Sequence, residues 1–288
     1  MIKLLALDLD GTLLDSSGKI SPENRRAIKR AEEIGVLVTI ATGRRFRDAQ
    51  PVGLEIELNA PMICHNGALL KYAKSLETVD VSILPHETLS DILRVGTEFG
   101  ADAMMSCDPH GKGILYYDRV SEANLPLQSY IAWSKRLHGK DAESAIHHVE
   151  NLSDIIHINE TVHVSFSGTC SPMNELREVL QSELHLSANI VATVYPHLDF
   201  TLLDILPYGA SKGVAVENLA LSSELSKENV MVIGDNFNDM EMLEYAGTAV
   251  VMGNASPELL ENEKFETTLS NDENGVALAV ERFILSRS

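Results

Sequence analysis

Two carboxylates one residue apart stand near the start of the chain, in the run Leu7-Asp8-Leu9-Asp10-Gly11-Thr12. Side chains in extended backbone alternate between two faces, so Asp8 and Asp10 leave on the same side. Two acids that close repel each other unless a cation lies between them. Carboxylate oxygens suit a hard divalent cation such as Mg2+. The spacing therefore indicates a cation site, and its simplest alternative is an acidic turn that follows a strand.

Three further segments carry groups that suit phosphate chemistry. They are Thr42-Gly43-Arg44, Lys212-Gly213, and the segment from Gly234-Asp235 to Asn238-Asp239. Asp235 and Asp239 add oxygen ligands. The Thr42 hydroxyl, the Gly43 amide and the Lys212 ammonium are suited to the nonbridging oxygens of a phosphoryl group.

Each of these segments also has an ordinary structural explanation when taken alone. A Thr-Gly pair can simply end a strand, a lysine in a first helical turn is commonly solvated, and paired aspartates can face water. Their shared position favours the functional explanation over the structural one, because each segment follows an apolar run or begins a helical pattern. In an open parallel sheet, ligands bind outside the carboxyl ends of the strands, so the segments are expected to converge on one crevice.

The elements that must position these residues alternate between strand and helix at both ends of the chain. The run from Ile2 to Leu7 is continuously apolar, as in a parallel strand covered on both faces. Strands are expected at residues 2–7, 36–41, 61–64, 230–233 and 248–252, and helices at 21–34, 211–221, 239–245 and 276–285. This alternation predicts an α/β fold with a Rossmann-like parallel sheet core assembled from both termini.

The middle of the chain has a different pattern, with helices beside paired strands. Helices are expected at residues 87–99 and 172–184, and strands at 103–106, 114–118, 163–167, 190–194 and 200–206. We therefore predict an inserted α+β cap domain at residues 84–206, and a core formed by residues 1–83 and 207–288. Residues 126–158 give no clear pattern.

The overall charge restricts the class of partner. The chain has 288 residues, of which 44% are hydrophobic, and a formal net charge of −19. This charge argues against nucleic acid and anionic membrane surfaces as partners. It would also repel an anionic substrate, so a phosphate site needs local positive charge from a metal, a lysine or a helix N-terminus.

The cysteines and the apolar segments indicate a cytoplasmic protein. Cys64, Cys107 and Cys170 are scattered, without the spacing of a zinc site or a disulfide framework. The N-terminal residues do not have the pattern of a signal peptide, and no apolar run has the length of a membrane span.

Together, the four segments resemble the motifs of the haloacid dehalogenase (HAD) superfamily of phosphohydrolases. Asp8-Leu9-Asp10-Gly11-Thr12 is similar to the first motif, Thr42-Gly43-Arg44 to the second, Lys212-Gly213 to the third, and residues 234–239 to the fourth. Within the superfamily the chain resembles the Cof-type branch, which has a large α/β cap between the second and third motifs. Asn66-Gly67-Ala68, residues 252–255 and residues 271–277 also resemble that branch.

The resemblance implies a two-step phosphoryl transfer. Asp8 would attack phosphorus and form an aspartyl-phosphate, and Asp10 would act as acid and then as base. Mg2+ would be held by Asp8, the backbone carbonyl of Asp10 and Asp235, while Asp239 and Asn238 order the surroundings of the metal.

The same resemblance implies a set of phosphate-binding groups. Thr42 and Lys212 would neutralise charge on the transferring oxygens, helped by the backbone amides of Leu9 and Gly43. Asn238 is included in this set.

The expected activity is Mg2+-dependent hydrolysis of small phosphorylated metabolites, such as sugar phosphates and nucleotide monophosphates. A sugar phosphomutase of the same superfamily and a phospho-ligand sensor without turnover are the two alternatives. A dehalogenase proper is disfavoured because Asp10, the proton shuttle for an alkoxide, is present. The sequence makes no prediction of the oligomeric state.

Overall fold

The computed structural model describes residues 1–195 and 198–287, which form two compact units. The first unit comprises Met1–Gly43, Ala49–Ser75 and Ser211–Ser288, and the second comprises Arg44–Asp48 and Leu76–Ala210. The predicted domain boundaries, after residues 83 and 206, stay a prediction. Among the described residues, none of the helices is both long and apolar enough to cross a membrane.

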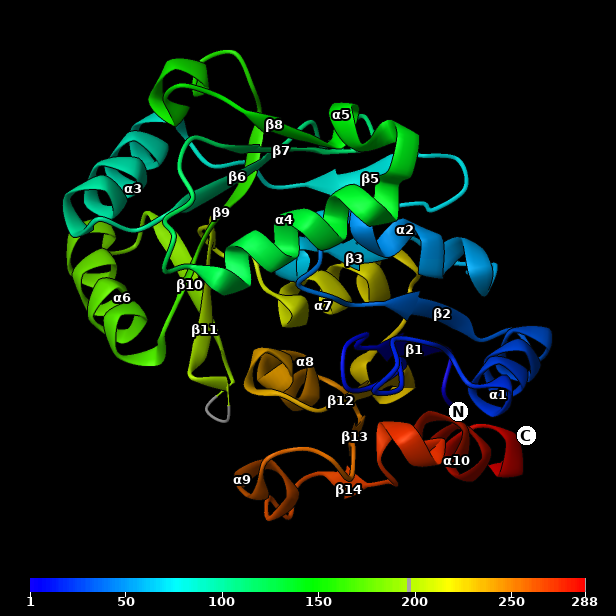
Figure 1. The fold of residues 1–288 in the computed structure, drawn as a ribbon. Helices are drawn as coiled ribbons and strands as arrows, with labels where there is room; N and C mark the ends of the chain where they lie inside the picture. Colours follow the sequence, from blue (N-terminus) through cyan, green and yellow to red (C-terminus); the bar gives the residue numbers. More distant parts are fainter. Residues whose placement is uncertain (196–197, 288) are drawn as a thin grey trace. The chain divides into compact units, whose positions relative to one another are not determined.

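The first unit is built on a five-stranded parallel sheet (Figure 1). Its order is β14-β13-β12-β1-β2, with strands β1 (Leu4–Leu7), β2 (Leu37–Ile40), β12 (Val230–Gly234), β13 (Thr248–Val251) and β14 (Glu266–Thr267). The N-terminal β1 pairs with β12 on one side and β2 on the other, so that Leu4 lies opposite Val230 and Leu37. The predicted α/β class, with one parallel sheet assembled from both ends of the chain, is confirmed.

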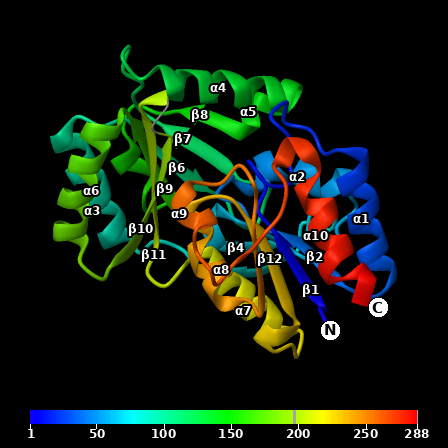
Figure 2. The same cartoon turned by 90° about the horizontal axis from the view of Figure 1, so that it is seen from below.

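Helices cover both faces of this sheet (Figure 2). Leu4 and Ala6 pack in one apolar cluster with α7 (Lys212–Ser222) and α8 (Met240–Tyr245). Helices α1 (Pro22–Glu33) and α10 (Gly275–Phe283) lie together on the other side. All four residues of β1 are fully buried, which is the physical reason for its continuous apolar sequence.

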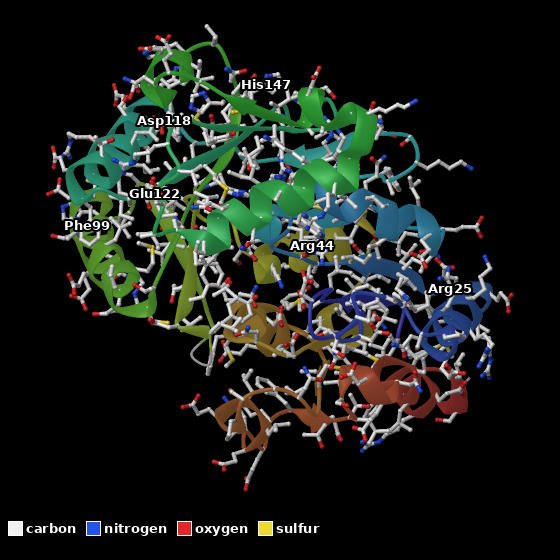
Figure 3. The ribbon with its side chains drawn as sticks, in the orientation of Figure 1. Arg25, Arg44, Phe99, Asp118, Glu122 and His147 are labelled. Carbon is white, nitrogen blue, oxygen red and sulfur yellow. The ribbon has the colours of Figure 1, made fainter. Side chains whose placement is uncertain are left out.

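The remaining elements of the first unit are shorter. They are β3 (Met62–Cys64), the 3-10 turn η1 (His65–Gly67), β4 (Leu69–Lys71), α9 (Pro257–Leu260) and most of α2 (Phe46–Glu55). Helix α1 begins as its sequence indicates, because the Ser21 hydroxyl accepts the Asn24 N–H at 3.1 Å. On the outer side of α1, Arg25 pairs with Glu55 at the end of α2 (Figure 3).

The second unit contains a six-stranded sheet of order β10-β11-β9-β6-β7-β8. Its strands are β6 (Ala103–Cys107), β7 (Ile114–Tyr117), β8 (Ile146–His148), β9 (Thr161–Gly168), β10 (Ala188–Tyr195) and β11 (Phe200–Pro207), and β5 (Thr78–Val81) precedes them in the chain. All pairs in this sheet are antiparallel except β7 with β8. The expected α+β composition of the middle of the chain is therefore confirmed.

Each face of this sheet has its own apolar core. Phe166 of β9 lies at the face covered by α3 (His86–Phe99) and α6 (Cys170–Leu184), and Phe99 packs against the same core (Figure 3). Leu115 of β7 packs with α4 (Leu125–His138) and the short α5 (Ala142–Ala145) in a second cluster.

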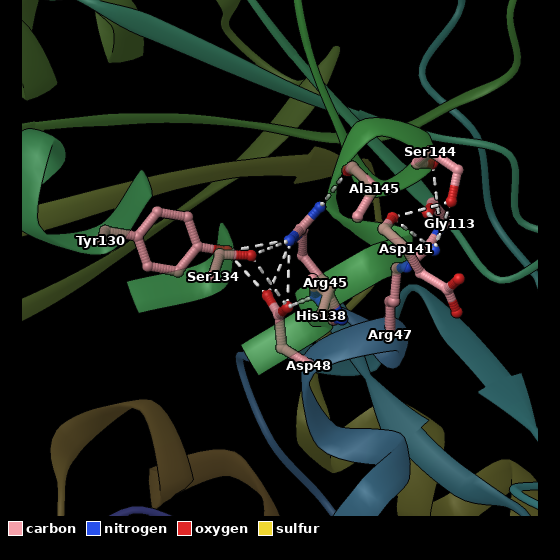
Figure 4. A network of polar contacts seen from close by, with 10 residues as sticks. All are labelled: Arg45, Arg47, Asp48, Gly113, Tyr130, Ser134, His138, Asp141, Ser144 and Ala145. Carbon is pink, nitrogen blue, oxygen red and sulfur yellow. Dashed lines mark hydrogen bonds and ion pairs between the residues drawn. The ribbon is translucent and has the colours of Figure 1, made fainter. Parts of the chain in front are cut away.

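A buried polar network joins the start of α2 to α4 within the second unit (Figure 4). Arg45 donates to Asp48 at 2.8 and 3.0 Å, to the Tyr130 hydroxyl at 2.9 Å and to Ser134 at 3.0 Å. His138 contacts Asp48 at 2.8 Å. Burial alone would raise the pKa of Asp48, but Arg45 and these hydrogen bonds hold it well below its ordinary value.

Neither helix in this network was predicted. The sequence pattern assigned no element to residues 46–55, and α4 falls largely in the stretch, residues 126–158, that gave no clear pattern. The buried face of α4 includes the polar Ser134 as well as the apolar Leu127 and Ile131. Ser134 is polar on this face because its hydroxyl bonds Arg45 and Asp48. Such a mixed face weakens the apolar periodicity from which helices are recognised.

His163 is a buried histidine of the second unit. It is buried in β9, with its Nε2 3.4 Å from the Ser106 hydroxyl. Burial, helped by the charge of Arg45, lowers the His163 pKa to about 3. An unfolded histidine titrates near pH 6.5, so between about pH 3 and pH 6.5 His163 itself binds more protons in the unfolded state than in the folded state.

We predict that this difference destabilises the second unit as the pH falls from about 6.5 towards 4, with a slope of up to about 1.4 kcal/mol per pH unit from His163. His163→Gln should remove that part of the slope. The measurement is urea unfolding followed by the fluorescence of Trp133, the single tryptophan, which lies on α4. The same change at the exposed His110 is the control. Equal slopes in wild type and His163→Gln would contradict the prediction.

Candidate active site

The predicted site residues of the first unit gather beyond the carboxyl ends of three adjacent strands. Asp8 follows β1, Thr42 follows β2 and Asp235 follows β12. Because β12, β1 and β2 are neighbours in the sheet, their carboxyl ends share one edge. Lys212 reaches the same edge from the start of α7, where the Ser211 hydroxyl accepts the Val214 N–H at 3.2 Å.

Lys212 is the centre of the cluster. Its Nζ lies 2.6 Å from Asp8 Oδ1 and 2.6 Å from Asp239 Oδ1. The lysine is 1% exposed and Asp239 is fully buried, so both ion pairs are shielded from water. Such pairs are retained only where the geometry compensates the loss of hydration.

Asp235 and Asp239 are held by a short turn after β12. One oxygen of Asp239 accepts the backbone N–H of Asp235 at 3.0 Å and that of Asn236 at 3.1 Å. Asp235 in turn accepts the Thr12 hydroxyl at 2.8 Å. One carboxylate oxygen from each of Asp8, Asp235 and Asp239 lies within 4.8 Å of the other two.

Two of these acids, Asp8 and Asp235, have raised pKa values. Burial, followed by the charge of Asp239, raises the Asp8 pKa well above its ordinary value, against the opposing effect of Lys212. Burial and Asp239 likewise raise the pKa of Asp235 to about 6. Burial would lower the pKa of Lys212, but Asp239 and Asp8 outweigh it and raise that pKa. The lysine therefore stays charged, and one positive charge faces three acids.

The donor set fits a divalent metal ion. Three converging carboxylates supply hard oxygen ligands, and the excess of negative charge is what a second cation would offset. Both oxygens of Asp239 already accept hydrogen bonds, one from Lys212 and the other from two backbone N–H groups. Asp8 and Asp235 therefore have the free coordination capacity, and Asp239 fits the role of orienting its neighbours.

The other predicted residues surround this cluster in different ways. The Asp10 side chain is exposed and is not one of the three converging carboxylates. Leu9 and Thr42 are buried, and the Thr42 N–H donates to Ile63 of β3 at 2.9 Å. The Asn238 amide donates to Asn66 Oδ1 at 3.4 Å, and Asn66 is not among the predicted site residues.

The loop that carries Asp8 and Asp10 depends on a glycine. Gly11 has a φ of +81°, and a Cβ there would lie 2.4 Å from Asp235 Oδ2. Only glycine combines this left-handed backbone with such a close approach to a carboxylate. The backbone then turns back, so that the Leu14 N–H donates to the Leu9 carbonyl at 3.0 Å.

Two asparagines far along the chain support this loop and were missed as site residues. Asn254 donates to the Gly11 carbonyl and Asn271 to the Leu14 carbonyl, both at 2.9 Å. Asn254 also accepts the Asn271 N–H at 2.9 Å. The sequence signal was only a likeness of residues 252–255 and 271–277 to the Cof-type branch, without a role, because more than 240 residues separate Asn254 from Gly11.

A parallel sheet with an acidic cluster at its carboxyl edge and an inserted α+β unit defines a class of hydrolase, and the comparisons with known proteins agree. The sequence matches the family described as haloacid dehalogenase-like hydrolase over residues 5–280. The chain therefore belongs to the haloacid dehalogenase-like hydrolases. This confirms the superfamily that the motifs resembled.

Individual relatives match over almost their whole length. The chain is 29% identical to the 5-amino-6-(5-phospho-D-ribitylamino)uracil phosphatase YwtE of Bacillus subtilis, over 98% of each chain. It is 27% identical to the pyridoxal phosphate phosphatase YbhA of Escherichia coli, over 88% of each. Among solved structures, TM0651 from Thermotoga maritima matches with a TM-score of 0.78 and 27% identity, over 98% of each chain. The expected enzyme class, a phosphoric monoester hydrolase, is confirmed.

The central lysine yields a prediction about stability. Lys212→Met removes the only cation bonded to Asp8 and Asp239 among the described residues, which leaves buried acids without a counter-charge. We expect the free energy of unfolding to fall by about 3–5 kcal/mol at pH 7 in the presence of a chelator. Urea unfolding measured by circular dichroism provides the test.

Lys29→Met is the matched control, because Lys29 is an exposed lysine on α1 whose ion pairs are 4.0 Å long. Its loss should change the stability by no more than about 0.5 kcal/mol. If both variants unfolded at the same urea concentration as wild type, the ion pairs of Lys212 would not stabilise the first unit.

Proposed function

We propose that the protein is a Mg2+-dependent phosphatase of small phosphorylated metabolites that works through an aspartyl-phosphate on Asp8. The observation that carries the proposal is Lys212 Nζ, 2.6 Å from both Asp8 and Asp239, with Asp235 beside them. A carboxylate nucleophile, a fixed cation and a divalent-metal donor set at one sheet edge are the parts that phosphoryl transfer needs.

In the first step an Asp8 carboxylate oxygen forms a bond to phosphorus while the bond to the ester oxygen breaks. The charge of Lys212 opposes the rise in the Asp8 pKa that burial and Asp239 cause, and so favours the ionised, nucleophilic form of Asp8. Asp10, which lies in the same loop as Asp8, gives its proton to the departing alkoxide.

In the second step a water attacks phosphorus and the bond to Asp8 breaks. Asp10, now a carboxylate, takes the proton of that water and returns to its starting state. Asp8, the backbone carbonyl of Asp10 and Asp235 would hold Mg2+, with Asp239 as the orienting residue. When bound, this ion supplies positive charge for the transferring phosphoryl group and lowers the repulsion among the acids.

The phosphoryl oxygens need hydrogen-bond donors in a protein whose net charge is −19. We assign this role to the Thr42 hydroxyl, the Lys212 ammonium, the Asn238 amide and the backbone amides of Leu9 and Gly43. These donors provide the local positive potential that the overall charge lacks.

The substrate class is that of small organic phosphate monoesters. Two relatives are named for 5-amino-6-(5-phospho-D-ribitylamino)uracil and pyridoxal phosphate, which belong to this class. Sugar phosphates and nucleotide monophosphates complete the proposed panel. We assign the second unit as the cap domain that determines specificity, and the cytoplasm as the compartment, in keeping with three free cysteines.

Replacement of the nucleophile tests the proposal. In Asp8→Asn, the amide cannot form the phosphorylated intermediate, so we expect phosphate release to fall by about 1,000-fold or more. The assay follows free orthophosphate from the panel with Mg2+, without any bisphosphate activator, and a chelator should abolish it.

Asp91→Asn, an exposed aspartate on α3, is the control and should retain wild-type rates. Three outcomes would contradict the proposal. Wild-type rates in Asp8→Asn would exclude Asp8 as the nucleophile, whereas no chelator-sensitive release from any substrate by the wild type would favour a phospho-ligand sensor. Activity that appears only with a bisphosphate activator would indicate a mutase.

The role of Asp10 makes a separate prediction about the leaving group. An aryl phosphate expels a weakly basic phenolate that needs little protonation, whereas an alkyl phosphate expels a strongly basic alkoxide. Asp10→Asn should therefore lower kcat/KM for a sugar phosphate about 10–100-fold more than for p-nitrophenyl phosphate. Equal losses for both substrates would rule out Asp10 as the general acid of the first step.

A further inference from the structure

We infer that Asn66 is a positioning residue for the phosphate-binding groups, acting through Gly43 and Asn238. The inference rests on the proposed function and deepens it, because it names a residue that neither the four motifs nor the carboxylate cluster includes. Asn66 is the central residue of turn η1 (His65–Gly67), which directly follows β3.

The backbone at Asn66 is unusual and buried. Asn66 has a left-handed conformation, with φ of 50° and ψ of 33°, and is 2% exposed. Asparagine and glycine are the residues that adopt this conformation most readily. The chain can therefore turn directly after β3 and bring the Asn66 side chain against its neighbours.

The first neighbour is the Thr42-Gly43 segment. The Asn66 N–H donates to the Thr42 carbonyl at 3.0 Å, and the Thr42 N–H donates to the Ile63 carbonyl at 2.9 Å. A Cβ at Gly43 would lie 3.0 Å from Asn66 Oδ1 and 3.1 Å from Nδ2. The Asn66 amide thus packs directly on the backbone of Gly43. The Gly43 N–H is one of the proposed hydrogen-bond donors to the phosphoryl oxygens.

The second neighbour is Asn238 in the turn after β12. The Asn238 Nδ2 donates to Asn66 Oδ1 at 3.4 Å. This bond occupies one donor of the Asn238 amide and fixes the direction in which its remaining polar atoms point. Asn66 therefore orients a side chain that is assigned to phosphate binding.

The same turn also meets the helix that carries Lys212. Gly67 has a φ of +101°, and a Cβ there would lie 2.1 Å from the Ser211 carbonyl oxygen and 3.0 Å from the backbone nitrogen of Lys212. The glycine permits η1 to pack against the start of α7. The turn η1 consequently contacts the segments that carry Gly43, Asn238 and Lys212. The Asn66 amide packs against Gly43 and accepts a hydrogen bond from Asn238.

Asn66→Gly is the sharpest variant, because glycine keeps the left-handed backbone and removes only the amide. Asn274→Gly is its matched control. Asn274 also has a left-handed backbone, with φ of 64° and ψ of 36°, but lies before α10. Both changes add the same backbone freedom to the unfolded chain, so a difference between them in activity reports the Asn66 side chain.

We expect Asn66→Gly to lower kcat by about 10-fold or more, while its Tm stays within a few degrees of that of Asn274→Gly. Asn274→Gly should keep the wild-type kcat. A second readout is independent of turnover: inorganic phosphate added with Mg2+ should raise the Tm of wild type and Asn274→Gly more than that of Asn66→Gly.

A double-mutant cycle with Asn238→Ala tests the route of the effect. If Asn66 acts through Asn238, the double variant should lose little more kcat than the worse single variant. Fully multiplicative losses would overturn this route. Wild-type kcat and phosphate response in Asn66→Gly would overturn the assignment of Asn66 while leaving the proposed function intact. A wild-type protein that releases no phosphate from the panel would overturn both.

Discussion

The first unit depends on one interaction, the contact of a buried lysine ammonium with two of three converging carboxylates. Lys212 Nζ bonds Asp8 and Asp239 at 2.6 Å, and Asp235 lies within the same cluster. Loss of the lysine or of its acidic partners would destabilise the fold, because the remaining charge would be buried without hydration. The lysine balances only part of the negative charge of the three acids, and the remaining negative charge suits a divalent cation, as the proposed function requires.

The surrounding backbone is arranged to keep this cluster in place. Gly11 lets the first loop approach Asp235, and the turn after β12 gives Asp239 two backbone N–H donors. Asn254 and Asn271 donate hydrogen bonds to the backbone carbonyls of Gly11 and Leu14 in the first loop. Together these contacts support the loop that carries Asp8 and the turn that carries Asp235, which come from separate stretches of the chain.

The second unit is organised around a different buried ion pair. Arg45 and Asp48 come immediately after the Thr42-Gly43 segment in sequence and bond α4 through Tyr130, Ser134 and His138. Both ions are almost fully buried, so the pair is satisfied by hydrogen bonds and not by solvent. This network fixes the segment at residues 44–48 to the second unit, directly beside the chain position of a proposed phosphate-binding motif.

The sequence by itself determined the parts that depend on local pattern. The buried run Leu4–Leu7 and the alternation at both ends predicted the parallel sheet, because strands covered on both faces must be continuously apolar. The spacing of Asp8 and Asp10 and the position of Lys212 before an apolar helix indicated the chemistry. Tertiary structure alone decided that Lys212 bonds Asp239 as well as Asp8, that Asn66 lies against Gly43 and Asn238, and that α4 closes on Arg45. These contacts join residues tens to hundreds of positions apart, and their polar side chains leave no periodic signal, so only the folded chain can bring them together.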